Sequence, residues 1–102
     1  MKKVDFNKKA VIETAKILEC NLETIFAVYK LKDGSRMSSE LTIIRDAKAP
    51  MINISNCTTY LFDTVEELNA YIDKKFEIYN SDKEMYQKFT GMDDETWEEW
   101  NK

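Results

Sequence analysis

The stretch Leu22–Arg45 reads LETIFAVYKLKDGSRMSSELTIIR, and it decides the predicted fold. Its first half is rich in β-branched and aromatic residues, a composition typical of strands. Asp33–Gly34 then supplies a turn signal with a strand-like run on each side, which predicts an antiparallel hairpin. Alternation along the returning strand places four residues on one face: Met37, Ser39, Leu41 and Ile43.

A helix is predicted before the hairpin, over residues 8–20. Asn7 is a suitable N-cap, because its side chain can accept a hydrogen bond from the first turn. One helical stripe would carry Val11, Ala15, Leu18 and Leu22. After the hairpin, Pro50 interrupts the chain because it cannot donate to a ladder. Residues 51–62, MINISNCTTYLF, then predict one strand, or two short strands divided near Asn56.

A longer helix is predicted next, over residues 64–79. It begins at DTVEEL, which resembles a capping box with Asp63 or Thr64 as the cap and Glu66 or Glu67 three residues on. Apolar residues then recur at spacings of three and four, which is typical of a helix that lies on a sheet. They are Val65, Leu68, Ile72, Phe76 and Tyr79.

Two short helices are predicted at the C-terminal end. SDKE at Ser81–Glu84 forms a second capping box, and Gly91 suits the position just after the helix that it opens. The terminal DDETWEEWNK predicts a last short helix capped by Asp93 or Asp94. The predicted fold is therefore α+β: an N-terminal helix, a three-stranded antiparallel sheet, then two or three C-terminal helices. Residues 1–102 form a single domain, since this length supports one core.

Composition narrows the functional classes. No apolar run approaches the roughly 18 residues that a membrane span needs, and acids stand where a signal peptide would be apolar. We therefore expect a cytoplasmic protein without a membrane partner. In that compartment Cys20 and Cys57 are expected to be reduced and buried.

An enzyme is not expected, and neither is a cofactor or a metal site. The chain has no histidine, which removes the commonest general base and zinc ligand. The two glycines lie in the hairpin turn and after a helix, so no glycine-rich phosphate loop is present. Adjacent carboxylates such as Glu98 and Glu99 point about 100° apart on a helix, which makes a poor catalytic pair.

The charge is unevenly distributed. The net charge is −4, but residues 1–62 carry ten bases and seven acids, whereas residues 63–102 carry five bases and twelve acids. The resulting −7 of the second part would repel phosphate, so direct nucleic-acid binding is not expected. A strongly acidic surface suits a basic protein partner instead.

Two tryptophans accompany the acids at the end of the chain. Trp97 and Trp100 are three residues apart and would share a helix face. One interpretation places both indoles on the core, with the acids as the solvated side. The other leaves at least one indole exposed as an anchor, because tryptophan is enriched at interface hot spots.

The chain resembles the small, acidic, phage-encoded anti-CRISPR proteins that block RNA-guided DNA nucleases. The resemblance covers the order of elements, the size, the lysine-rich composition typical of a low-GC source, and the acid-rich DTVEEL and DDETWEEW segments. It implies that carboxylates occupy phosphate positions or compete for the arginines that read the PAM. It also implies the cytoplasm of the host cell as the location.

Together these observations predict an inhibitor protein whose acidic helical face binds a basic nuclease or other nucleic-acid-processing protein. The residues predicted to bind the partner are Asp93, Asp94, Glu95, Trp97, Glu98, Glu99 and Trp100, with Glu66, Glu67 and Asp73 as a second set on the preceding helix. Two alternatives stay open: an immunity protein that neutralises a nuclease toxin, and a structural or regulatory module that forms a homodimer through the tryptophans.

Overall fold

Six antiparallel strands form a single sheet in the computed structural model, which describes residues 1–79 and 81–101. The strands are β1 (Lys2–Val4), β2 (Glu23–Lys30), β3 (Arg36–Ile44), β4 (Met51–Ile54), β5 (Thr58–Leu61) and β6 (Phe76–Tyr79), in the order β1-β5-β4-β3-β2-β6. The helices are α1 (Lys8–Leu18), α2 (Val65–Lys75), α3 (Asp82–Thr90) and α4 (Asp94–Trp100). The α+β class is confirmed, but the prediction of three strands is wrong.

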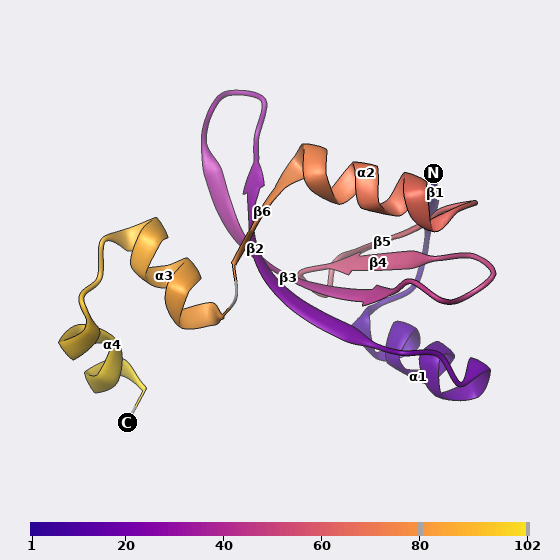
Figure 1. Cartoon of the computed structure of the whole chain (residues 1–102), viewed down its shortest axis with the longest axis horizontal. Coiled ribbons are helices and arrows are strands. Elements are labelled where there is room, and N and C mark those ends of the chain that lie inside the picture. Colours follow the sequence, from indigo (N-terminus) through magenta and orange to yellow (C-terminus); the bar gives the residue numbers. More distant parts are fainter. Residues whose placement is uncertain (80, 102) are drawn as a thin grey trace.

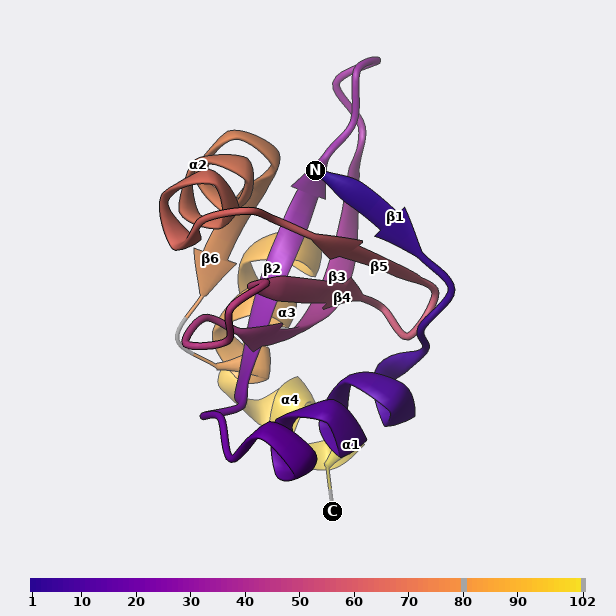
Figure 2. The same cartoon turned by 90° about the vertical axis from the view of Figure 1, so that its right-hand side faces the viewer.

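The predicted hairpin is the centre of the sheet. Its register runs from Glu23 opposite Ile43 to Lys30 opposite Arg36. Gly34 adopts a φ of 87° in the turn, a conformation that glycine takes without a Cβ penalty. The hairpin tip projects beyond the rest of the sheet in both views (Figures 1 and 2).

The segment 51–62 forms two strands rather than one. Ser55 and Asn56 both have positive φ angles, 50° and 58°, which reverse the chain between β4 and β5. The Oδ1 of Asn53 accepts a hydrogen bond from the Asn56 backbone N–H at 3.0 Å. The Asn53 side chain also donates to the hydroxyl of Thr59, so the short hairpin has internal polar support.

The two outermost strands were not predicted. β1 has only three residues, two of them lysines, and it is held by pairing with β5. β6 lies where helix 64–79 was predicted to continue, but α2 ends at Lys75 and Phe76 is extended. Phe76 also fits the apolar stripe of the helix, so the spacing of apolar residues could not show whether Phe76 continues the helix or begins a strand. The free edge of β2 offers a ladder, and β6 pairs with it from Phe76 opposite Tyr29.

The helices cover the two faces of the sheet unequally (Figure 1). α2 packs on one face, where its residues Leu68 and Ile72 join Leu41, Ile43 and Ile52 in the main core. The other face carries α1 in a smaller cluster and α3 against β2, β3 and β6. Both N-caps named for the longer helices are confirmed, as Asn7 for α1 and Thr64 for α2.

Two details differ from the sequence-based expectations. α1 stops at Leu18, so Leu18 and Leu22 are exposed instead of completing the buried stripe. Both cysteines are unpaired, but Cys57 is exposed and Cys20 is only half-buried. Desolvation, with a smaller contribution from Asp46, raises the pKa of the Cys20 thiol. Within the described residues, no helix is long and apolar enough to cross a membrane.

Candidate partner-binding surface

The C-terminal pair of helices is attached to the sheet through α3. The Ser81 hydroxyl accepts a hydrogen bond from the backbone N–H of Glu84 at 3.1 Å, which caps the helix as predicted. Met85 of α3 is buried, and the helix packs against β2 and β3. Gly91 ends the helix with a φ of 75°, also as predicted.

α4 begins at an aspartate cap. The Oδ1 of Asp93 accepts a hydrogen bond from the Thr96 backbone N–H at 2.8 Å. Hydrogen bonding by Thr96, through its side chain first and its backbone second, lowers the pKa of Asp93. Asp94 accepts from the Gln87 side chain at 2.6 Å and pairs with the Lys83 ammonium at 3.3 Å. These two contacts, with Gln87 the larger, lower the pKa of Asp94. Both aspartates therefore have structural roles within the α3–α4 pair.

The two tryptophans have different surroundings. The Trp97 indole stacks on the Tyr86 ring of α3, with ring centroids 6.0 Å apart and planes 29° apart. Trp100 is 74% exposed, and α4 contributes no buried residue. Neither indole reaches the main core, so α4 is held by Trp97 and Asp94 and leaves Trp100 in solvent.

Three carboxylates of the predicted set remain on the outer side of α4. Glu95, Glu98 and Glu99 are exposed, and none forms an ion pair with another described residue. At about 100° per residue, Glu99 lies roughly 100° around the helix from Trp100, Glu95 roughly 140° and Glu98 roughly 160°. All three carboxylates therefore lie roughly 100° or more around the helix from the exposed indole, with Glu99 the nearest and Glu98 almost opposite.

The second acidic set lies elsewhere. Glu66, Glu67 and Asp73 are exposed on α2, which is on the opposite side of the sheet from α4 (Figure 1). The structure does not bring the two acidic sets together into one surface. A partner held by α4 would therefore not also cover α2 without wrapping around the sheet.

Three residues of α3 that position α4 were missed from the sequence. Lys83, Tyr86 and Gln87 supply the ion pair, the aromatic stack and the hydrogen bond described above. Their spacing of three and four places them on one helix face, a signal that the sequence carried. The sequence did not show that this face of α3 binds α4, because α4 could equally have packed on the sheet.

The part of the chain that the structure describes holds no group of three or more Cys, Asp or Glu side chains arranged to bind a metal ion. No protein-family model, curated protein or solved structure matches the chain. The function therefore has to be inferred from the geometry of this molecule.

Proposed function

We propose that the protein is a non-enzymatic inhibitor that binds a basic protein through α4. The observation that supports this most is Trp100, which is 74% exposed on a short helix whose three exposed carboxylates have no ion-pair partner among the described residues. Packing does not account for the indole, since α4 adds no buried residue to the core. An exposed tryptophan on a helix that also carries unpaired acids is typical of a surface that anchors a basic partner.

The proposed target is a nucleic-acid-processing protein, and an RNA-guided DNA nuclease is the leading example. Such proteins bind phosphate through lysines and arginines, for which carboxylates can compete. The exposed acids of α4, Glu95, Glu98 and Glu99, support this choice. The resemblance to anti-CRISPR proteins now depends on size, composition and charge, because the six-stranded sheet differs from the three-stranded one that it implied. A nuclease toxin is the alternative target.

The arrangement on α4 suggests how the partner is held. A pocket on the partner would receive the Trp100 indole, and a basic side chain at its rim would meet Glu99, the nearest carboxylate. Glu95 would contribute one turn earlier, and Glu98 would contribute least, since it lies almost opposite the indole. Trp97, Asp93 and Asp94 would act indirectly, by holding α4 in place on α3.

A purified RNA-guided DNA nuclease, loaded with its guide, tests the proposal. Calorimetry and DNA cleavage would be measured with the wild type, Trp100→Ala, Glu99→Lys and a matched control, Glu66→Lys on the far helix. We expect saturation at one inhibitor per nuclease, about 30-fold weaker binding for Trp100→Ala, and affinity that falls with salt. Glu66→Lys should bind as the wild type does.

Three outcomes would contradict parts of the proposal. Equal binding by all four proteins would move the interface away from α4. Inhibition of a nuclease toxin instead of the RNA-guided nuclease would favour the immunity alternative. A concentration-dependent mass in sedimentation that Trp100→Ala abolishes would show that the indole serves a homodimer.

A further inference from the structure

A separate hollow lies on the sheet face that α2 covers, far from α4. It has a volume of about 180 Å³ and lies between α2, the β2–β3 hairpin and the β4–β5 hairpin. Tyr29, Tyr60 and Tyr71 line it together with Ser39 and the apolar side chains of Met37 and Ile54. For comparison, a cavity of about 150 Å³ is large enough to hold benzene. The hollow therefore has room for one aromatic ring with a small substituent.

Aromatic contacts hold its walls in place. The Tyr71 ring contacts Tyr60, Phe62 and Phe76, with centroids 5.8, 5.5 and 6.2 Å away. Tyr29 packs on Phe76 at 5.2 Å from the other side. Because the rings brace one another, the hollow is formed before anything enters it, which lowers the entropic cost of binding.

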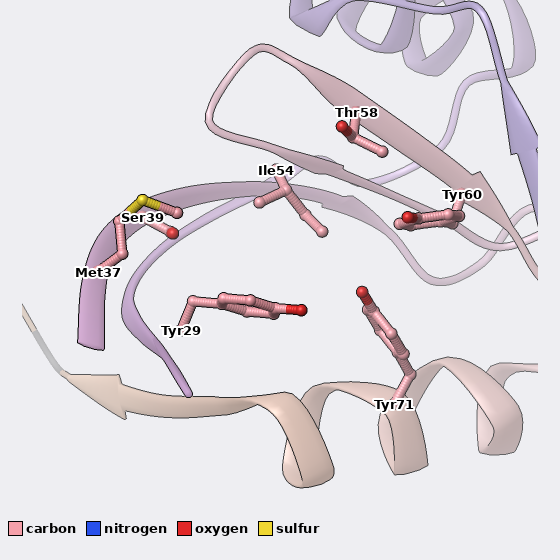
Figure 3. A pocket seen from close by; sticks show the side chains of 7 residues that line it. All are labelled: Tyr29, Met37, Ser39, Ile54, Thr58, Tyr60 and Tyr71. Carbon is pink, nitrogen blue, oxygen red and sulfur yellow. The ribbon is translucent and has the colours of Figure 1, made fainter. Parts of the chain in front are cut away.

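Hydroxyl groups converge inside the hollow. The hydroxyls of Tyr29, Tyr60 and Tyr71 point toward its centre from β2, β5 and α2 (Figure 3). None of the three has a hydrogen bond to another described residue. Ser39, on β3, is only 4% exposed, and its Oγ also has no partner. Native structures rarely leave a buried hydroxyl unpaired, so the Ser39 Oγ points to a missing partner, and the half-buried tyrosine hydroxyls beside it supply further donors.

The electrostatics of the hollow favour an uncharged ligand. None of the described residues that line it is a lysine, arginine, aspartate or glutamate. Burial, assisted by the neighbouring Tyr60 and Tyr29, raises the pKa of Tyr71 to about 12. The phenol therefore stays protonated at neutral pH and acts as a donor. A carboxylate or ammonium group would lose its hydration here without gaining a counter-charge, which is costly. A carbonyl oxygen would lose less, and hydrogen bonds from the hydroxyls would compensate it.

We propose that this hollow is a binding site for a small, neutral aromatic molecule that carries a carbonyl oxygen. The ring occupies the apolar space beside Ile54 and Met37, and the oxygen accepts hydrogen bonds from the tyrosine hydroxyls and Ser39. Met37 lies at the exposed rim, where a flexible thioether can adapt to the ring. The site is independent of the α4 surface, because it lies on the opposite face of the sheet.

Three probes of similar size test separately the need for an aromatic ring, for an acceptor oxygen and for zero charge: benzamide, toluene and benzoate. Each would be titrated into the ¹⁵N-labelled full chain and followed by NMR. We expect saturable shifts with benzamide that centre on Tyr29, Ser39 and Tyr71. Toluene lacks the acceptor and benzoate carries an uncompensated charge, so both should bind more weakly. Shifts that stay linear with benzamide, or tighter binding of benzoate, would overturn the proposal.

Hydroxyl deletions provide the second test. Tyr71→Phe and Ser39→Ala each remove one donor and keep the shape of the hollow, so each should weaken benzamide about 3- to 10-fold and leave toluene unchanged. Tyr86→Phe on α3 is the matched control and should bind benzamide normally. Ser39→Ala should not lower the unfolding midpoint, because its hydroxyl has no partner to lose. Unchanged benzamide affinity in both folded variants would overturn the proposal.

Discussion

The sheet with α2 and the α3–α4 pair are built differently. In the first region, Leu41, Ile52 and Leu68 are fully buried, and strands far apart in the chain pack through them. In the second, the buried Met85 anchors α3, and among the described residues α4 is held by one ring stack and a few polar contacts. Stability therefore resides mainly in the sheet, while the exposed aromatic and acidic groups lie on a part that can change at little cost to the fold.

The largest loss of stability is expected for a substitution between α2 and the sheet. Leu68→Ala removes a side chain that is 0% exposed between α2 and the sheet. The lost burial and the remaining cavity should lower the free energy of unfolding by about 2–5 kcal/mol. Urea denaturation followed by circular dichroism would measure it.

Two controls sharpen that experiment. Leu18→Ala makes the same chemical change at a leucine that is 55% exposed, so it should cost less than about 0.5 kcal/mol. Trp100→Ala should be equally mild although it removes a larger side chain. A loss for Trp100→Ala comparable to that of Leu68→Ala would show that α4 belongs to the core and would abolish the contrast.

A smaller, local effect is expected for Trp97→Ala. It removes the stack on Tyr86, a contact worth about 0.5–1.5 kcal/mol. A helix as short as α4 is marginal without packing, so residues 94–100 should lose amide protection while the sheet keeps it. Hydrogen exchange resolved by residue would test this. Uniform loss across the sheet would show that the two regions unfold together.

The smallest expected effect comes from pH. Hydrogen bonds lower the pKa values of Asp93 and Asp94 below their ordinary 3.8 in the folded state. Their stabilising contribution is therefore complete above that ordinary value and is lost as the pH falls through the lowered one. We expect α4 to fray at acidic pH while the sheet stays intact, and NMR of the α4 amides would follow it.

A substitution can separate the cap from its titration. Asn is as good an N-cap as Asp but does not ionise, so Asp93→Asn should keep α4 folded at neutral pH and reduce its acid response. If α4 in this variant frays over the same pH range as in the wild type, the response would have to come from Asp94 or another group. Asp94→Asn would then distinguish between them.

Local signals in the sequence predicted much of the fold. The turn at Asp33–Gly34 between strand-like runs identified the central hairpin. Asn7 and Ser81 were predicted as caps, and Thr64 and Asp93 each as one of two adjacent candidates, because a short polar side chain at that position bonds the first turn. These predictions succeeded because each depends on groups within a few residues of one another.

Tertiary structure decided the rest. β1 and β6 form because the edges of β5 and β2 were free to pair with them. The residue patterns of Lys2–Val4 and Phe76–Tyr79 do not by themselves indicate that pairing. Packing on α3 also determined that Trp97 is stacked while Trp100 is exposed. The sequence could not separate them, because the two residues are three apart and were expected to share one helix face.

The same division applies to the two proposed sites. The combination of acids with tryptophans in residues 93–102 is visible in the sequence, and it suggested that this segment binds a basic partner. Only the tertiary structure placed Glu66, Glu67 and Asp73 on the far side of the sheet and gathered three tyrosines around Ser39. The physical reason is that charge and helix caps are properties of neighbouring residues, whereas exposure and pockets depend on which distant surfaces the whole chain can bury.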